Sequence, residues 1–128
     1  MVTYITNRKT KEEVLNGFEP LIRTWFNNKF DDLTPPQAMA VPLIEKNKNV
    51  LVSSPTGTGK TLTAFLSILN NFLKLHREDN FEDGVHAIYI SPLKALANDI
   101  DRNLKQPLEE MMVLAEELEI DVPEIKVA

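Results

Sequence analysis

The chain has 128 residues, of which 43% are hydrophobic and 26% are charged, and its formal net charge is −5. This length and composition fit one globular unit with a single core. The absence of cysteine excludes a disulfide framework, a thiolate metal site and a cysteine nucleophile, and two histidines are too few for a histidine metal site. Because no apolar run reaches membrane-spanning length and the N-terminus does not resemble a signal peptide, we expect a cytoplasmic protein without a membrane partner.

The negative charge is concentrated near the C-terminal end. Residues 104–128 contain two basic and seven acidic residues, whereas residues 1–103 contain twelve of each sign. Such an acidic stretch is typical of a solvated helix face. The chain has no broad basic region of the kind that dominates non-specific nucleic-acid binding. Any contact with nucleic acid must therefore come from local groups that bind the phosphate backbone.

The first third of the chain is predicted to be helical. Apolar residues recur at helical spacing from Lys11 to Asn28, with Pro20 as a break between two short helices. After a turn at residues 31–36, a second helical segment is expected from Pro36 or Gln37 to Lys46. Pro42 lies inside this segment and is expected to kink it or to mark its true start.

The remaining chain alternates between expected strands and helices. In chain order we expect a strand at 49–53, a helix at 60–75, a polar loop at 76–84, a strand at 86–91, a helix after Pro92 that ends or bends at Pro107, a helix at 108–118 and the beginning of a strand at 123–128. This alternation predicts an α/β fold in which helices flank a parallel sheet of about three strands. Because three strands do not complete such a domain, we expect the chain to be a truncated piece of a larger domain.

Residues 53–61 have the pattern of a phosphate-binding loop. They read Ser-Ser-Pro-Thr-Gly-Thr-Gly-Lys-Thr, between the first expected strand and a helix. Gly57 and Gly59 permit left-handed backbone angles, so that several N–H groups can point at phosphate oxygens. Lys60 can reach the β- and γ-phosphates, and the Thr61 hydroxyl can ligate Mg²⁺. The alternative is an ordinary turn that caps a helix. We expect ATP and Mg²⁺ to bind through Ser54, Pro55, Thr56, Gly57, Thr58, Gly59, Lys60 and Thr61, with Lys60 and Thr61 as the catalytic residues.

Three segments together resemble superfamily 2 helicases of the DEAD/DEAH-box kind, and most closely their Lhr-type branch. Phe30-Asp-Asp-Leu-Thr-Pro-Pro-Gln37 resembles the Q motif, and Ser54-Pro-Thr-Gly-Thr-Gly-Lys-Thr61 resembles motif I, in which Ser or Ala is common at the first position. Ser91-Pro-Leu-Lys-Ala-Leu-Ala97 resembles motif Ia. The resemblance implies that the chain is the N-terminal portion of the first RecA-like domain of a nucleic-acid-dependent ATPase. DNA is the expected nucleic-acid partner, with RNA as the alternative.

The resemblance assigns further roles to individual residues. It implies that Gln37 reads the adenine edge, since a side-chain amide offers both a donor and an acceptor; the alternative is a helix-start Gln without a ligand. An aromatic residue upstream of Gln37 often stacks on adenine in this family, and the candidates here are Phe18, Trp25, Phe26 and Phe30. Ser91, Pro92 and Lys94 are the expected nucleic-acid contacts, against the alternative of a plain strand-to-helix turn capped by Ser91.

Groups that hydrolysis requires are missing from the sequence. No Asp-Glu-x-His or Asp-Glu-x-Asp occurs in it, and the resemblance implies that an arginine comes from a second RecA-like domain. We therefore expect a longer protein to be the enzyme and this chain alone not to turn over. Its unfinished sheet edge is expected to permit self-association. Two rival functions are a small-molecule kinase with a phosphate loop and a non-enzymatic nucleotide-binding module.

Overall fold

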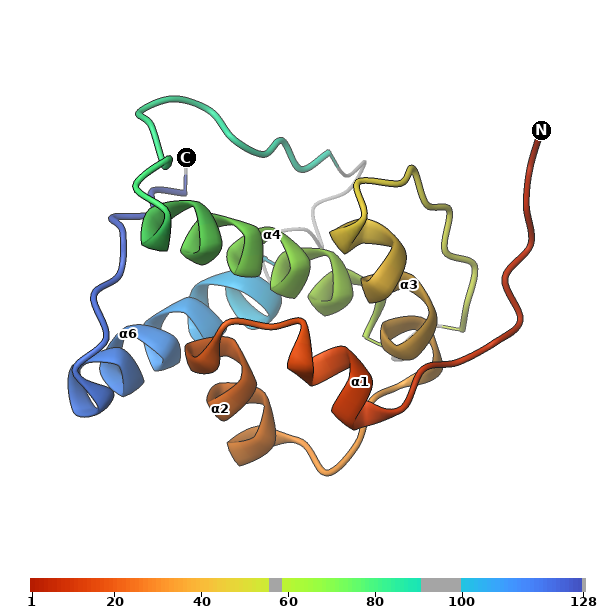
Figure 1. Ribbon diagram of the computed structural model, residues 1–128, viewed down its shortest axis with the longest axis horizontal. Helices are drawn as coiled ribbons and strands as arrows, with labels where there is room; N and C mark the ends of the chain where they lie inside the picture. Colours follow the sequence, from red (N-terminus) through yellow and green to blue (C-terminus); the bar gives the residue numbers. More distant parts are fainter. Residues whose placement is uncertain (56–58, 91–99, 128) are drawn as a thin grey trace.

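The computed structural model describes residues 1–55, 59–90 and 100–127, and these form a helical assembly (Figure 1). Its helices are α1 (Lys11–Asn16), α2 (Pro20–Lys29), α3 (Pro35–Glu45), α4 (Lys60–Arg77), a π-helical turn (Asp101–Lys105) and α6 (Gln106–Leu118). The predicted break at Pro20 is confirmed, because α1 and α2 are separate helices and Pro20 opens the second. None of the described helices is long and apolar enough to cross a membrane.

Helix α3 continues through Pro42 and ends at Glu45. Proline has no N–H, so the carbonyl four residues earlier loses its helical partner. That carbonyl belongs to Ala38, and it accepts a hydrogen bond from the Lys9 N–H at 3.4 Å. The N-terminal segment therefore satisfies the acceptor that Pro42 leaves open. This contact gives a physical reason why a helix with an internal proline is not interrupted.

The core is formed by the faces on which α1, α2, α3, α4 and α6 meet. Leu21, Ile22 and Phe26 on α2 are at most 1% exposed, and Leu66 and Met111 contribute equally buried side chains from α4 and α6. Buried apolar residues recur along α4 at helical spacing, and Figure 1 shows this long helix running through the middle of the assembly. The start of α4 is thus held rigidly by a packed helix rather than by a loop.

The predicted parallel sheet was wrong. No β-strand occurs in the described part of the chain, and residues 49–53, 86–90 and 123–127 are irregular. A strand is stabilised by a neighbouring strand that satisfies its backbone groups, and none of these extended segments pairs with another. Apolar composition favoured buried strands, but Leu51 is 95% exposed and Ile90 is 87% exposed. An apolar composition favours burial of a segment, but it does not provide a second strand with which the segment can pair.

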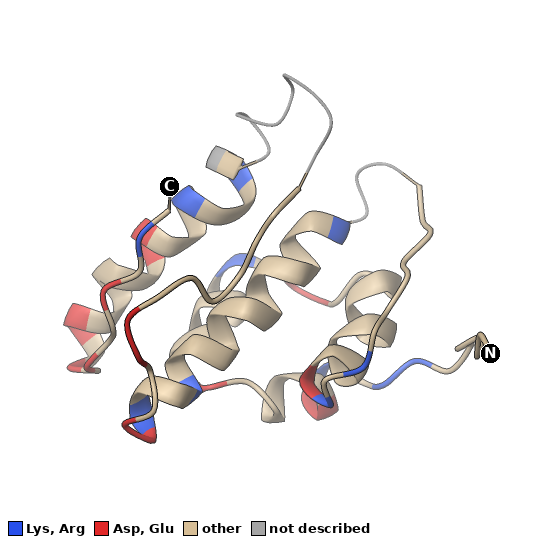
Figure 2. Cartoon of the chain, turned by 90° about the horizontal axis from the view of Figure 1, so that it is seen from above, with Lys and Arg blue, Asp and Glu red and all other residues tan. Residues whose placement is uncertain are grey.

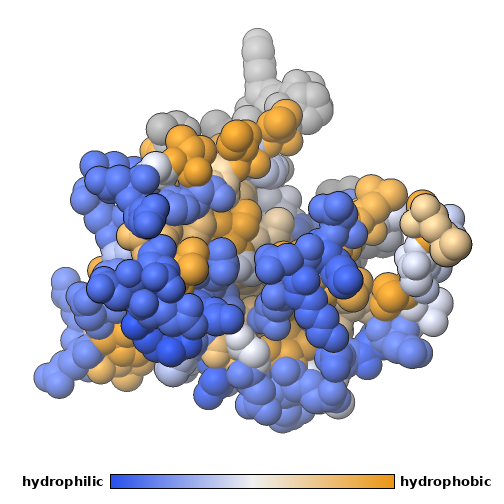
Figure 3. Space-filling model, turned by 45° about the horizontal axis from the view of Figure 1, so that its top comes forward, coloured by the Kyte–Doolittle hydropathy of each residue, from blue (hydrophilic) through white to orange (hydrophobic). Residues whose placement is uncertain are grey.

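Residues 81–90 are attached to α4 by aromatic contacts rather than by a sheet. The ring of Phe81 lies 5.1 Å from that of Phe72 and stacks on His86 at 4.5 Å, and Tyr89 lies 5.1 Å from Phe65. The other side of this segment faces outward, and Figure 3 shows hydrophobic side chains on this side of the molecule. The exposed apolar residues are Val85, Ile88 and Ile90. The self-association expected from the sequence stays a prediction.

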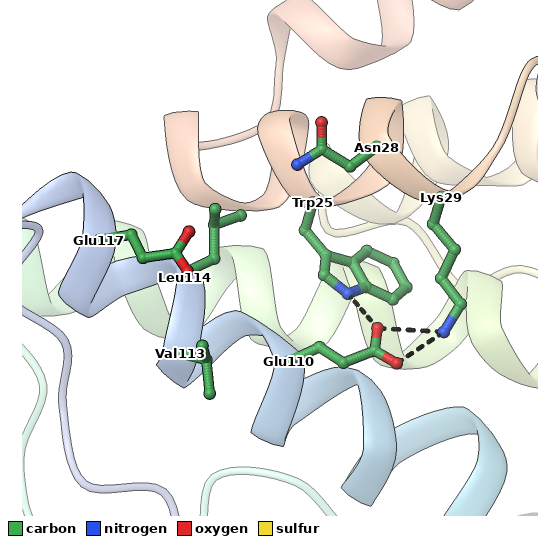
Figure 4. Close-up of a pocket in the computed structure, with 7 residues that line it drawn as sticks. All are labelled: Trp25, Asn28, Lys29, Glu110, Val113, Leu114 and Glu117. Carbon is green, nitrogen blue, oxygen red and sulfur yellow. Dashed lines mark hydrogen bonds and ion pairs between the residues drawn. The ribbon is translucent and has the colours of Figure 1, made fainter.

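An ion pair with an aromatic donor joins α2 to α6 (Figure 4). The Trp25 indole N–H donates to Glu110 at 2.7 Å, and Lys29 donates to both oxygens of the same carboxylate at 2.9 and 3.0 Å. Burial raises the pKa of Glu110, but the hydrogen bonds from Lys29 and Trp25 outweigh it, and the net pKa is lowered. The carboxylate is therefore held ionised where α2 crosses α6, beside an open hollow lined by Val113, Leu114 and Glu117.

The charge of the last helical segment is divided along its length, as Figure 2 shows. Arg102 and Lys105 lie in the π-helical turn that precedes α6, whereas exposed acidic residues follow along α6 and beyond it. The sequence predicts that a helix ends or bends at Pro107. The helix does not end there, because the π-helical turn continues directly into α6 at Gln106 and α6 runs on to Leu118. Pro107 lies in the first turn of α6.

Candidate functional site

The site begins where the loop of residues 53–59 meets α4. Gly59 has φ of 79°, a left-handed conformation, and it immediately precedes Lys60, the first residue of α4. A β-carbon on Gly59 would also lie only 2.9 Å from the Gln37 side-chain nitrogen. The left-handed backbone angle therefore favours glycine here, and any larger residue would also have to displace the Gln37 side-chain amide.

The N-terminus of α4 has the features of an anion site. The first N–H groups of a helix have no intrahelical partner and carry the positive end of the helix dipole. No acidic residue occupies the first turn of α4, so no carboxylate of its own neutralises this field. The helix is anchored just behind this point, since both the N–H and the hydroxyl of Thr63 donate to the Gly59 carbonyl, at 2.9 and 2.7 Å. The donors at the start of α4 are thus held in a fixed direction.

Lys60 reaches back across the loop. Its ammonium group donates to the Ser54 carbonyl at 2.6 Å, so the two ends of the loop are joined. The Lys60 side chain is exposed and that of Thr61 is partly exposed, which leaves both accessible from solvent. Lys60 would have to exchange the Ser54 carbonyl for a phosphate oxygen, and a solvated ammonium on a flexible stem can make that change.

Gln37 and Thr34 at the start of α3 lie against Gly59. Gln37 is 3% exposed, and its Oε1 accepts a hydrogen bond from the Thr34 N–H at 2.9 Å. The Thr34 side-chain oxygen faces the Gln37 N–H in the other half of this capping box, in a contact that falls short of ordinary hydrogen-bond geometry. Sequence reasoning missed Thr34, although Thr-x-x-Gln is the capping-box pattern and pointed to it.

The structure separates the four aromatic candidates for adenine stacking. Phe18, Trp25 and Phe26 are at most 4% exposed and belong to the core. Phe30 is half-buried, with its ring 5.9 Å from Trp25 and 4.9 Å from Phe26. Of the four, Phe30 alone retains substantial accessible surface, and the others are used for packing.

Several predicted site residues lie outside the described part of the chain. These are Thr56, Gly57 and Thr58 of the phosphate loop, and Ser91, Pro92 and Lys94 of the expected nucleic-acid contact. The structure does bring together parts of two predicted motifs, because the Gln37 side chain of α3 lies against Gly59 at the start of α4. Within residues 1–55, 59–90 and 100–127, no group of histidine and acidic side chains is arranged to hold a metal ion.

Comparison with known proteins assigns this arrangement to a class. The model of the DEAD/DEAH box helicase family matches residues 34–125, and the chain belongs to that family. The chain is 46% identical over 127 residues to ATP-dependent helicase Lhr-Core of Methanocaldococcus jannaschii, covering 99% of the chain and 15% of that protein. It is 55% identical over 100 residues to Lhr-Core of Saccharolobus solfataricus, covering 78% of the chain and 11% of that protein.

A solved structure is similar as well. It is the Mycobacterium smegmatis helicase Lhr bound to ssDNA and AMP-PNP, with a TM-score of 0.75 and 39% sequence identity over 90% of this chain and 14% of that one. The resemblance to Lhr-type helicases that motifs I, Ia and Q indicated is confirmed. The chain spans about one seventh of the length of these relatives.

Proposed function

We propose that this chain is the ATP-binding portion of a nucleic-acid-dependent helicase, and that unwinding or translocation belongs to a longer protein that contains it. The names of the relatives support an ATP-dependent helicase, and the similar solved structure was bound to ssDNA and to AMP-PNP. The chain would supply the N-terminal portion of the helicase ATP-binding domain. DNA is favoured as the nucleic acid, with Ser91, Pro92 and Lys94 as contacts to its backbone.

The observation that carries this proposal is the geometry at Gly59. A left-handed glycine is followed at once by an 18-residue helix, and Lys60 closes the preceding loop through the Ser54 carbonyl at 2.6 Å. The described residues thus supply two parts that a phosphate site uses, the positive end of a helix dipole and a movable ammonium.

The residues at this site fit ATP with Mg²⁺. Lys60 would bind the β- and γ-phosphates, and the partly exposed Thr61 hydroxyl at the first turn of α4 would be a ligand of Mg²⁺. Bound Mg²⁺ would neutralise charge on the phosphate oxygens. Gln37 would read the adenine edge through its amide nitrogen and the second lone pair of Oε1, since the first lone pair already accepts from Thr34.

The chain alone is expected not to hydrolyse ATP. Phosphate binding is similar before and after hydrolysis, whereas acceleration requires groups aimed at charge that develops in the transition state. The sequence contains no Asp-Glu-x-His or Asp-Glu-x-Asp to provide them. We expect phosphate release above background only from a protein of the relatives' length, and more of it with single-stranded DNA than with RNA or without nucleic acid. Equal hydrolysis by the short chain, or no stimulation of the long one by either nucleic acid, would contradict the proposal.

A second prediction concerns the choice of base. Gln37→Ala is expected to weaken ATP more than GTP, because the hydrogen bonds to the adenine edge are lost only with adenine. With a neutral hydrogen bond contributing about 1 kcal/mol, the ATP:GTP preference should fall by roughly fivefold or more. Parallel calorimetric titrations of both nucleotides measure this ratio. An unchanged ratio would leave Gln37 with its helix-start role alone.

A further inference from the structure

The hollow between α2 and α6 combines an apolar surface with negative charge. It has a volume of about 400 Å³. Four residues of α6 line it at spacings of three and four positions, and Figure 4 shows them opposite α2: Glu110, Val113, Leu114 and Glu117. Val113 is 60% exposed. A large apolar side chain is therefore open to solvent between two carboxylates.

Only one of these two carboxylates is neutralised. Glu110 accepts hydrogen bonds from Trp25 and Lys29, so the only cation that lines the hollow is already engaged. Glu117 has no hydrogen bond or ion pair within the described part of the chain. An occupant that complements this surface carries an apolar side chain for Val113 and a cation for Glu117, and an anionic occupant is repelled.

The chain itself contains such a segment in residues 1–8, here called the arm. The arm is irregular and exposed along its length, and Figure 1 shows that it extends away from the helices. Val2 and Tyr4 are 73% and 86% exposed. Arg8 is the charged side chain of the arm, and it has no partner among the described residues. The arm is tied to the helices only at its end, where the Lys9 N–H binds to a carbonyl of α3.

The arm and the hollow also match in length. An extended chain from Tyr4 to Arg8 spans up to about 13 Å, and α6 rises about 10 Å from Glu110 to Glu117. With Arg8 at Glu117, Tyr4 therefore reaches Val113. Figure 1 shows the arm and α6 at opposite ends of the long axis, so the arm of a chain does not face the hollow of the same chain.

We propose that the arm of one copy binds in the hollow of a second copy, where Tyr4 packs on Val113 and Arg8 pairs with Glu117. Because the arm and the hollow lie at opposite ends, the contact is head-to-tail and leaves one arm and one hollow unoccupied. Association then continues beyond two copies unless a ring closes. An arm of this length buries less area than a stable interface, so the expected Kd is roughly 0.1–1 mM. The inference does not depend on nucleotide binding.

The test uses the single tryptophan of the chain, Trp25, which lines the hollow and reports its occupancy. A synthetic peptide of residues 1–8 is expected to change Trp25 fluorescence saturably. Glu117→Lys in the protein, or Arg8→Glu in the peptide, is expected to weaken binding by about three- to tenfold, because attraction becomes repulsion. Combining the two changes is expected to restore it. Glu116→Lys is the matched control, since Glu116 is an exposed neighbour on α6 that does not line the hollow.

Sedimentation velocity of the whole chain tests the second copy as the occupant. We expect the average mass to rise with protein concentration in wild type and Glu116→Lys, and to rise less in Glu117→Lys. No saturable fluorescence change at millimolar peptide, equal losses in the two lysine variants, or no recovery in the charge-swapped pair would overturn the inference. A chain that stays monomeric would also overturn it. If Ile88→Asp removes association and Glu117→Lys does not, the exposed segment at 85–90 is the interface and the inference fails.

Discussion

Replacement of Lys60 by alanine is expected to weaken the binding of ATP with Mg²⁺ by more than about tenfold, since losing a charged contact with the phosphates costs on the order of 2–5 kcal/mol. Lys60 stands at the first position of α4 and already reaches across the loop to Ser54, so its ammonium lies where phosphate oxygens would meet the helix N-terminus. Isothermal titration calorimetry with ATP measures the effect directly.

Lys74→Ala is the matched control for this experiment. Lys74 lies on the same helix, in its last turn, and its removal changes the net charge by the same amount. A general electrostatic effect would weaken binding similarly in both variants, whereas a phosphate contact predicts a loss only for Lys60→Ala. Equal affinities of wild type and Lys60→Ala would contradict the phosphate role.

Asn70→Ala is expected to lower the free energy of unfolding by about 2–6 kcal/mol, because it leaves two backbone groups without partners at about 1–3 kcal/mol each. The side-chain carbonyl of Asn70 accepts from the Glu19 N–H, and its side-chain amide nitrogen donates to the Gly17 carbonyl at 3.3 Å. Asn70 is 6% exposed, so water does not readily replace it. One side chain of α4 thus holds the turn between α1 and α2.

Asn71 provides an internal control for this prediction. It is the same residue type in the same helix, it is exposed, and helix propensity affects both substitutions equally. Asn71→Ala is expected to change stability by no more than about 0.5 kcal/mol, as exposed positions ordinarily do. Urea denaturation of the two variants measures the difference. A similar loss in both would mean that the turn does not depend on Asn70.

The local features of the site were predictable from sequence. Gly59 precedes a lysine and an amphipathic segment, and this order predicts both the left-handed turn and the start of α4. The break at Pro20 likewise follows from a ring that fixes φ and removes a donor. Each depends on residues within a few positions of one another.

The parallel sheet was predicted wrongly from local sequence patterns. Residues 87–90 are apolar or aromatic and include the β-branched Ile88 and Ile90, which favours a buried strand, but a strand exists only if another segment satisfies its backbone. In the structure this segment is instead held by Phe81, His86 and Tyr89 against α4. The pattern of apolar residues indicates which side chains favour burial, but it does not indicate which other segment they pack against or pair with.

The sequence by itself determined the helices on either side of the predicted phosphate loop and membership of a helicase family, because these depend on short patterns and on fixed backbone preferences. The tertiary structure alone decided that Phe18, Trp25 and Phe26 are core residues and that Asn70 holds a turn more than fifty residues away in sequence. It alone placed Thr34 and Gln37 of α3 against Gly59. Contacts of this kind depend on how packed helices are oriented, and side-chain packing between distant segments is not encoded in any local pattern.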